Sequence, residues 1–318
     1  MDDQLVPVAG ATEDTRCPAT AIGFDGQALT VTDGATGEHL RLAPASLYLY
    51  ACHPFQGQRG RHRQSPQVRG LALLDADGLV LLDLPGEWPV SKAWRFSGRT
   101  GIPMVNASHT PSPKVRAALA RRAPGWRRVH GLAAPPRPWW HRPVAVGAGF
   151  AGLALMAYLA SQGLWATWRA LASVGRFLLD VLDLKWLAVV FSPALMLLRP
   201  VTSRVYRWQV RRGRILGPPG GPYLKVERGV RLRVIQRGRV LADLPKGRVA
   251  TLLHYRYDDL TGLLLLDADN RPLYHLPGPW DPGAAQRFAE RHGIRMAAYR
   301  LSREEYLDLV GTCEEAIP

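Results

Sequence analysis

The sequence predicts an α+β fold: two copies of a small, mostly antiparallel β domain with C-terminal helices, separated by a two-helix transmembrane hairpin. Three observations predict this fold: an internal repeat, a long uncharged segment between its two copies, and arginine-rich stretches on both sides of that segment. The chain has 318 residues, which is enough for two ordinary domains and the segments that connect them.

The internal repeat covers residues 70–102 and 262–294 without a gap. The two stretches, GLALLDADGLVLLDLPGEWPVSKAWRFSGRTGI and GLLLLDADNRPLYHLPGPWDPGAAQRFAERHGI, are identical at 18 of 33 positions. Their separation is far longer than the repeat unit of a solenoid protein. The sequence therefore indicates one domain that is present twice, with the remaining segment inserted between the copies.

The pattern of apolar and turn residues predicts a β-hairpin within each copy. Apolar runs flank Asp75–Gly78 in the first copy and Asp267–Asn270 in the second. Glycine and asparagine both tolerate the positive φ of a tight hairpin turn. The Asp-x-Asp spacing also resembles the start of a calcium loop. That loop needs glycine at its sixth position and glutamate at its twelfth, and neither copy has them, so the hairpin turn is preferred.

A helix is expected after the hairpin. In the second copy Asp281 is a suitable N-cap, Pro282 suits the first turn, and Gly293 suits the position just past the helix end. Phe96 and Phe288, which occupy equivalent places in the two copies, are expected to fix this helix to the sheet.

Short alternating strands are expected before the repeat, and a second short helix after it, starting at Ser112 or Ser302. The strands are predicted at Ala28–Thr32, Glu38–Leu42 and Ser46–Ala51, and at Val230–Gln236, Arg239–Leu244 and Val249–Tyr257. This order, several strands followed by a helix, resembles the pleckstrin-homology-like modules of small bacterial membrane proteins. The resemblance implies a β-barrel-like fold that is used for binding rather than catalysis.

The uncharged segment at residues 143–168 is long enough to cross a bilayer, which takes about 20 apolar residues. We predict the first span at about residues 144–165. Amphipathic rings favour the two membrane interfaces, and four tryptophans stand near its ends: Trp139, Trp140, Trp165 and Trp168.

The second span is predicted at about residues 178–198. It contains Asp180 and Asp183 at one end, where both carboxylates can reach headgroups and water. Carboxylates at this depth are also candidates for functional polar groups. An interfacial or re-entrant helix is the alternative structure for this segment. Two copies of one domain are expected to share a compartment, which requires an even number of crossings.

Arginines on both sides of the hairpin set its expected orientation. Basic residues favour the cytoplasmic side of a membrane, so we predict a plasma-membrane protein with two spans and both termini in the cytoplasm. The residues expected to contact the anionic inner leaflet are Arg121, Arg122, Arg127, Arg128, Arg137, Arg142, Arg199, Arg204, Arg207, Arg211, Arg212 and Arg214.

The resulting domain organisation alternates folded and connecting segments. A flexible tail (1–18) precedes the first α+β repeat domain (19–122), and a basic linker (123–142) leads to the transmembrane hairpin (143–198). A second basic linker (199–221) leads to the second repeat domain (222–311) and a short tail (312–318).

No catalytic, cofactor-binding or metal-ligating constellation is recognisable in the sequence, so we expect neither enzyme activity nor a cofactor. The favoured function is that of a membrane-anchored, non-catalytic adaptor or regulatory scaffold with two cytoplasmic binding modules. Its partners would be the anionic bilayer and either a protein or further copies of the chain. An oligomeric transport or channel-associated subunit is the alternative. A nucleic-acid-binding role is a second alternative, although we expect no nucleic-acid partner.

Overall fold

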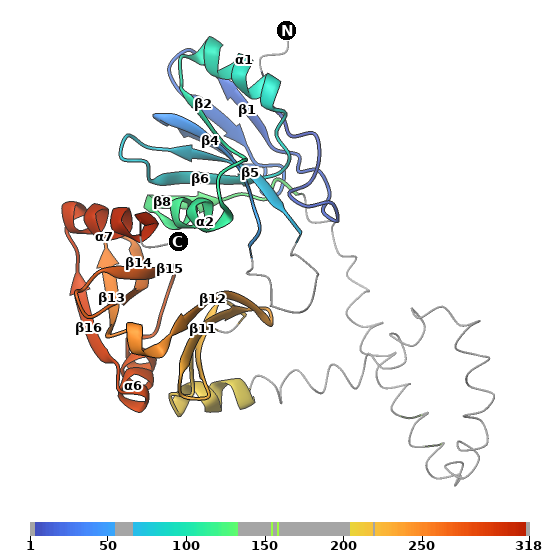
Figure 1. Ribbon diagram of the computed structural model, residues 1–318. Coiled ribbons are helices and arrows are strands. Elements are labelled where there is room, and N and C mark those ends of the chain that lie inside the picture. The colour runs from blue at the N-terminus through green and yellow to red at the C-terminus, as the bar shows by residue number, and fades with distance from the viewer. Residues whose placement is uncertain are drawn as a thin grey trace. The chain divides into compact units, whose positions relative to one another are not determined.

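The computed structural model describes residues 4–54, 66–132, 204–218 and 220–315, together with Ala154 and Tyr158. The chain divides into two compact units: Met1–Ala134 with Gln209–Pro318, and Pro135–Trp208. The first unit contains both copies of the repeat and all the labelled elements of Figure 1. Of the second unit, only Ala154, Tyr158 and residues 204–208 are described, and all of these are helical.

The first copy contains two sheets. A three-stranded antiparallel sheet is made of β1 (Ala21–Phe24), β2 (Leu29–Thr32) and β3 (His39–Leu42). The five-stranded sheet has the order β7-β4-β5-β6-β8 and contains β4 (Ser46–Cys52), β5 (Val68–Leu74), β6 (Val80–Pro85), β7 (Met104–Ala107) and β8 (Arg122–Arg128). Helix α1 (Val90–Thr100) precedes β7, and α2 (Ser112–Ala120) precedes β8.

The second copy repeats this arrangement. One four-stranded sheet has the order β12-β11-β10-β9 and contains β9 (Ile215–Leu216), β10 (Tyr223–Glu227), β11 (Arg231–Gln236) and β12 (Arg239–Pro245). After the 3-10 turn η1 (Lys246–Arg248), the other sheet has the order β15-β14-β13-β16 and contains β13 (Thr251–Tyr257), β14 (Leu260–Leu266), β15 (Pro272–Pro277) and β16 (Arg295–Arg300). Its helices are α6 (Pro282–His292) and α7 (Arg303–Glu315).

The predicted hairpin turn and helix signals are confirmed in both copies. The carboxylates of Asp75 and Asp267 each accept hydrogen bonds from two backbone amides within their turns, and Asn270 has a φ of 61°. Asp281 caps α6 by accepting from the amides of Gly283 and Ala284, both at 3.1 Å. The six strands predicted before the repeat match observed strands to within two residues, whereas β1, β7, β8, β9, β10 and β16 were not predicted.

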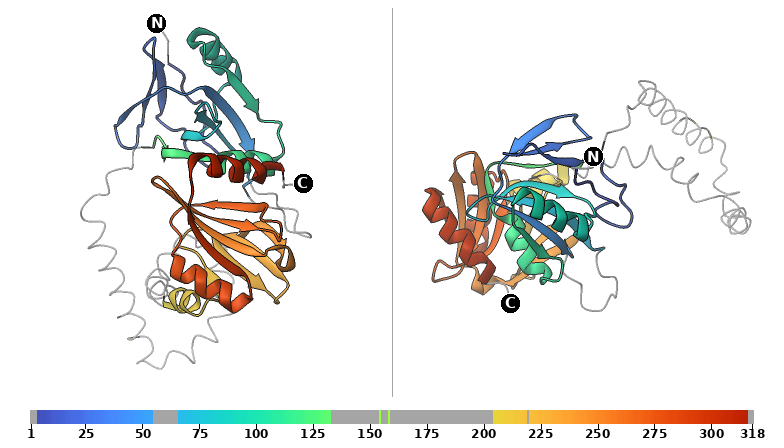
Figure 2. Two further views of the ribbon diagram at one scale, coloured as in Figure 1. Left: turned by 90° about the vertical axis from the view of Figure 1, so that its left-hand side faces the viewer. Right: turned by 90° about the horizontal axis from the view of Figure 1, so that it is seen from above.

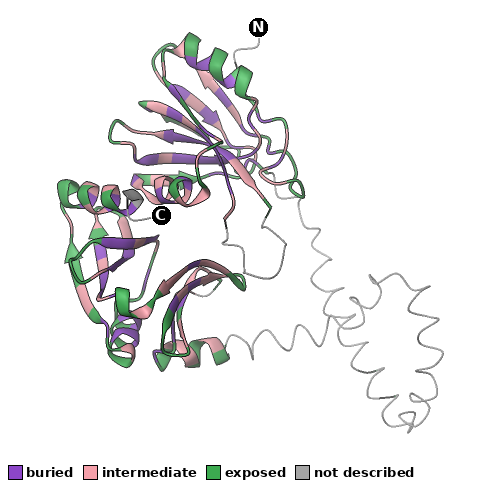
Figure 3. Ribbon diagram, viewed as in Figure 1, coloured by how far each residue is buried: buried purple, intermediate pink, exposed green. Residues whose placement is uncertain are grey.

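Each larger sheet buries both of its faces, and Figure 3 shows the buried residues gathered on its strands. One face packs against the preceding small sheet and against α1 or α6, with Phe96 and Phe288 fully buried there as predicted. The indole N–H of Trp88 donates to the carbonyl of Leu84, and the indole N–H of Trp280 makes the equivalent bond in the second copy. The other face packs against α2 or α7.

A tyrosine lies over a glycine on the neighbouring strand in both larger sheets. Tyr50 on β4 is paired with Gly70 on β5, and Tyr255 on β13 is paired with Gly262 on β14. A Cβ atom at either glycine would overlap the ring of its tyrosine. The identity of these glycines in the repeat therefore reflects packing, since both tyrosines are almost fully buried.

The two copies share one apolar core, and Figure 2 shows α7 beside β8 and α2 in the left view. Leu79 and Ala123 of the first copy join Tyr255, Leu264 and Tyr306 of the second, among other residues, in this core.

Polar contacts run across the same boundary. The hydroxyl of Tyr306 donates to the carbonyl of Arg122 at 3.1 Å and accepts from its amide at 3.2 Å. The amide of Gly125 donates to the carboxylate of Asp259 at 3.1 Å. The copies therefore form one unit rather than two independent modules.

The predicted transmembrane hairpin has to be corrected. Among the residues that the structure describes, no helix is both long and apolar enough to span a bilayer. Helix α7, with 13 residues, is only about 20 Å long, against a hydrocarbon core of about 30 Å. The predicted spans, 144–165 and 178–198, lie outside the described residues except for Ala154 and Tyr158. The structure supports a mixed fold of several sheets and helices, and we withdraw the predicted hairpin, plasma-membrane location and cytoplasmic termini.

Replacing Gly70 by alanine should lower the free energy of unfolding by about 1–3 kcal/mol, because the new methyl group overlaps the buried Tyr50 ring. Urea unfolding of the full chain measures this change. The control is Gly98→Ala in α1, where a Cβ meets nothing within 4 Å. That substitution should stabilise the helix by up to about 1 kcal/mol. Equal effects at the two sites would contradict the packing explanation.

Replacing Tyr306 by alanine should open the boundary between the copies, because it removes a fully buried ring and both bonds to the Arg122 backbone. The readout is Cys313, which lies in the shared core and whose pKa burial raises to about 12. Its reaction with a thiol reagent should accelerate at least about tenfold. Cys52, buried in a separate cluster of the first copy, is the internal control. Equal acceleration at both thiols would indicate global unfolding instead.

Candidate functional site

The sheet β9–β12 carries an excess of lysine and arginine on its outer face and in its turns, and we call it the basic sheet. Its inner face packs into the core of the second copy through Leu224, Leu232 and Val234. Because successive side chains of a strand alternate between faces, Lys225, Arg231 and Arg233 lie on the opposite face. Lys225 and Arg231 are exposed there, and Lys225 is paired in register with Arg233.

Both hairpin turns of the basic sheet place an arginine in the left-handed backbone region. Between β10 and β11, Arg228 and Gly229 have φ values of 51° and 73°. Between β11 and β12, Arg237 and Gly238 have φ values of 50° and 74°. Positive φ at both central residues is typical of a type I′ hairpin turn, which prefers Asn-Gly or Asp-Gly. A left-handed conformation costs an ordinary L-residue roughly 1–2 kcal/mol.

In the described part of the chain, no ion pair of either turn arginine offsets this free-energy cost. Arg228 and Arg237 are exposed, and neither forms an ion pair with another described residue. Asparagine would satisfy the same turns with less strain. Backbone strain that the fold does not require is a reason to look for a function at that position.

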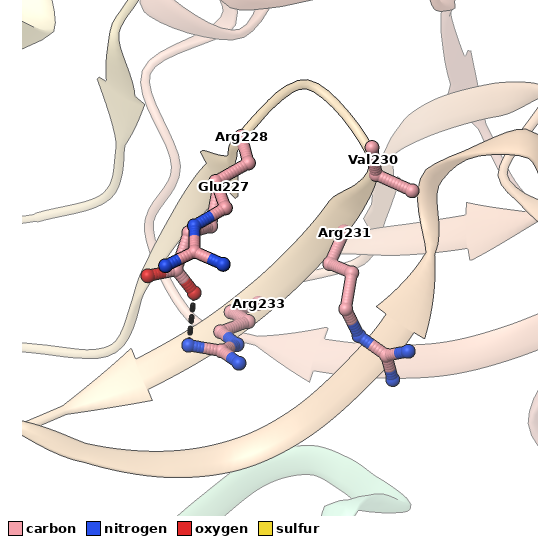
Figure 4. A pocket seen from close by; sticks show the side chains of 5 residues that line it. All are labelled: Glu227, Arg228, Val230, Arg231 and Arg233. Carbon is pink, nitrogen blue, oxygen red and sulfur yellow. Dashed lines mark ion pairs between the residues drawn. The ribbon is translucent and has the colours of Figure 1, made fainter.

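Two arginines within the strands of the basic sheet, in contrast to those at its turns, form ion pairs with carboxylates. Arg231 pairs with Asp243 at 2.7 Å, and Arg233 pairs with both Asp243 and Glu227. Figure 4 shows Arg228 and Val230 at the turn, beside the Glu227–Arg233 ion pair. An open depression of about 290 Å³ lies here, lined by Glu227, Arg228, Val230, Arg231 and Arg233.

The equivalent sheet of the first copy, β1–β3, has the opposite charge balance. Residues 21–42 contain one arginine and three carboxylates, whereas residues 215–245 contain six lysines and arginines and two carboxylates. The same architecture thus exists with either sign of charge, so the positive charge of the basic sheet is not required for folding.

The predicted membrane-contact arginines fall into three groups. Arg211, Arg212 and Arg214 are exposed just before β9, and Arg204 and Arg207 are exposed in the second unit. Four others make contacts inside the first unit: Arg121 with the carbonyl of Gly311, Arg122 with the ring of Trp126, Arg127 with Glu38, and Arg128 with Asp83. Outside the described residues lie Arg137, Arg142, Arg199, Trp139, Trp140, Trp165, Trp168, Asp180 and Asp183.

A buried titratable position differs between the copies. In the first, the hydroxyl of Tyr50 donates to Asp83 at 2.7 Å, and Asp83 pairs with Arg128 at 3.0 Å. In the second, Tyr255 shares a hydrogen bond of 2.7 Å with His275, which occupies the place of Asp83. Burial, reinforced by nearby arginines, lowers the pKa of His275 to about 3. Tyr50, Asp83, Tyr255 and His275 are each less than a tenth exposed, so neither pair can contact a substrate in this conformation.

Comparison of the chain with protein-family models, curated proteins and solved structures gives no match. The likeness to pleckstrin-homology-like modules therefore stays a prediction. The function has to be argued from the site alone.

Sequence reasoning did not single out Arg228, Arg237 or Val230. Val230 lies next to the β10–β11 turn with 66% of its surface exposed. The Arg-Gly dipeptides at 228–229 and 237–238 could have drawn attention as hairpin turns with an unusual first residue. Their position on one sheet with the other cations, however, follows only from the strand order.

The buried His275 predicts a loss of stability in acid. Between pH 6.5 and about 3 the unfolded chain binds a proton at this residue and the folded chain does not. The free energy of unfolding therefore falls as the pH falls, by at most about 1.4 kcal/mol per pH unit from this group. Urea unfolding at several pH values should show a shallower dependence in His275→Asn. Identical slopes in the two proteins would contradict the prediction.

Proposed function

We propose that this chain is a non-catalytic binding scaffold, an adaptor or regulatory protein, in which the basic sheet recruits an anionic partner. The observation that supports the proposal is the pair of exposed turn arginines, Arg228 and Arg237, which the fold holds in a strained conformation without an internal partner among the described residues. The equivalent sheet of the first copy has the opposite charge balance. The fold therefore does not require the positive charge of the basic sheet, and this supports a functional role for that charge.

The partner that we propose for the basic sheet is a surface of anionic phospholipid headgroups. Each lysine or arginine near such a surface contributes about 1 kcal/mol of attraction. Val230, two residues after Arg228, is an exposed apolar side chain. In the proposed contact it enters the headgroup layer, as apolar residues of interfacial segments do. Contact of this kind is peripheral and requires no spanning helix.

The shared core between the copies gives the scaffold its mechanism. The Tyr306–Arg122 bonds and the surrounding apolar residues join the copies in one unit. Anchoring the basic sheet therefore also places the surfaces of the first copy at a set distance from the anchored partner, which raises the effective concentration for a second binding event.

Replacing Arg228 and Arg237 together by asparagine should weaken binding to anionic vesicles and stabilise the protein at the same time. Loss of two cations should reduce affinity roughly 30-fold at about 1 kcal/mol each. Asparagine should relieve the turn strain and raise the free energy of unfolding by up to about 1 kcal/mol per site. Vesicle co-sedimentation and urea unfolding of the full chain measure the two effects.

The vesicles contain phosphatidylcholine alone or with about one third phosphatidylglycerol. The matched control is Arg271→Gln with Arg300→Gln, which removes the same charge from exposed positions on another sheet. Affinity that falls equally in both variants, or in neither, would contradict the lipid proposal. Loss of binding to a DNA duplex, but not to vesicles, would favour the nucleic-acid alternative instead.

A further inference from the structure

Strand β16 forms one edge of the larger sheet of the second copy (Figure 1), and its only neighbour among the described strands is β13. The amides of Arg295 and Leu301 both donate to carbonyls on the β13 side, at 3.0 and 2.8 Å. Residues of a strand alternate between those that bond to one neighbour and those that are directed to the other side. The backbone groups directed to the open side therefore belong to Met296, Ala298 and Arg300.

The open backbone groups define the shape of a molecule that can bind to them. An extended peptide can add to a sheet edge as a further strand, with hydrogen bonds between the two main chains. Proline or a bulge often protects an exposed edge, but β16 contains no proline and its register with β13 is regular. The edge is therefore suited to an extended polypeptide segment.

Three exposed arginines flank this edge. Arg295 lies on the same face as Ala297, toward the core that contains α7, and Arg300 lies on the opposite face. Arg300 is paired in register with Arg256 on β13. Like charges directly opposite each other on neighbouring strands are destabilising. The chain thus tolerates an unfavourable pair of charges beside the open edge.

Carboxylates do not compensate these arginines within the described part of the chain. Strands β13 and β16 contain no aspartate or glutamate. The carboxylates that follow the two strands form no ion pair with the three arginines, and they belong to Asp258, Asp259, Glu304 and Glu305. The charge of the edge therefore remains available to a partner.

The first copy shows that the fold does not require these arginines. The equivalent edge strand is β7, which pairs in parallel with β4 as β16 pairs with β13. Pro103, Ser108 and Ala51 stand at the places of the three arginines. The same edge thus forms without any cation, which favours a function for the charge of the second copy.

We propose that β16 binds an extended acidic segment of a partner protein, which adds to the sheet as a further strand. The backbone of β16 supplies hydrogen bonds, and the arginines select carboxylates. Arg295 and Arg300 are five residues apart, so their side chains lie on opposite faces. A strand laid alongside them should carry two carboxylates five residues apart, whichever way it runs. Tyr299, with 64% of its surface exposed, can pack against a side chain opposite it.

The same charges disfavour a second copy of β16 as the occupant. A symmetric dimer would pair two β16 strands antiparallel, and in full register this would set Arg295 of each strand opposite Arg300 of the other. Such like-charge pairs oppose association, and charged side chains at sheet edges commonly prevent self-pairing. The charges therefore select an acidic segment of a different protein.

This inference goes beyond the function proposed above, because the edge strand and the basic sheet belong to different sheets. A failure of vesicle binding leaves the peptide site intact, and a failure of peptide binding leaves the lipid proposal intact.

Fluorescence anisotropy with a labelled synthetic peptide and the full chain tests the proposal. The probe carries two glutamates five residues apart, with valine and threonine between them, since both residues favour an extended conformation. It should bind at about 0.05 M salt and more weakly at about 0.5 M, as charges become screened. A peptide with its glutamates four residues apart presents both carboxylates on one face and should bind more weakly. A peptide with lysines in place of the glutamates should not bind.

A proline substitution tests the backbone bonds. Ala298→Pro removes an N–H group that is directed to the open side, and an edge strand tolerates proline at such a position. Loss of this bond should weaken peptide binding about tenfold. The matched control is Asn106→Pro at the equivalent position of β7, which should leave peptide binding unchanged. Urea unfolding shows whether each variant remains folded.

Charge exchange tests the selection of carboxylates and does not depend on the proline variant. Arg295→Glu with Arg300→Glu should abolish binding of the glutamate peptide and create binding of the lysine peptide. The Arg228→Asn, Arg237→Asn variant should bind the glutamate peptide like the wild type.

Three outcomes would overturn the proposal. The first is a wild-type protein that does not bind the glutamate peptide. The second is a folded Ala298→Pro variant that binds it normally. The third is binding that is lost in the Arg228→Asn, Arg237→Asn variant but kept after charge exchange at β16, which would assign the peptide to the basic sheet.

Discussion

The bond between the Tyr306 hydroxyl and the Arg122 backbone is the constraint on which the arrangement of the two copies depends. A buried tyrosine hydroxyl has to find hydrogen-bond partners, because leaving it unpaired costs most of its hydration free energy. Here the partners belong to the other copy, where the hydroxyl donates to one backbone group and accepts from another. Ordering of α7 and of β8 is therefore coupled, and the core residues around the bond are buried only when both copies are folded.

Because the domain is present twice, interactions that both copies share can be distinguished from features that only one copy has. Both retain the aspartate-headed turn, the tryptophan bond to a strand carbonyl, and the tyrosine over a glycine. These interactions satisfy buried polar groups or fill the core, so either copy needs them. The copies differ in the charge of the small sheet and in the exposed face of the first helix. Those differences lie on surfaces, where a change costs the fold little.

The excess positive charge divides into two classes once contacts are known. Arginines at or beside β8 are bound to a carbonyl, an aromatic ring or a carboxylate inside the first unit, and burial lowers the pKa of Arg122. Of these contacts, the one between Arg121 and the carbonyl of Gly311 joins the two copies, and the others lie within the first copy. Arginines at the turns of the basic sheet contact solvent instead. Net charge alone therefore overstates the charge that is available to a partner, because ion pairs and backbone contacts hold part of it.

The sequence by itself determined the duplication, the hairpin turns, the helix caps and most strands, because these depend on residues near each other in the chain. Asn270 at a positive φ and Asp281 at an N-cap are examples of such local chemistry. Tertiary structure alone decided the pairing of β8 with β6 and the burial of Tyr306 against Arg122. It also decided which arginines remain exposed. These features join residues far apart in sequence, and their geometry depends on strand order and on how two cores merge, which no local pattern encodes.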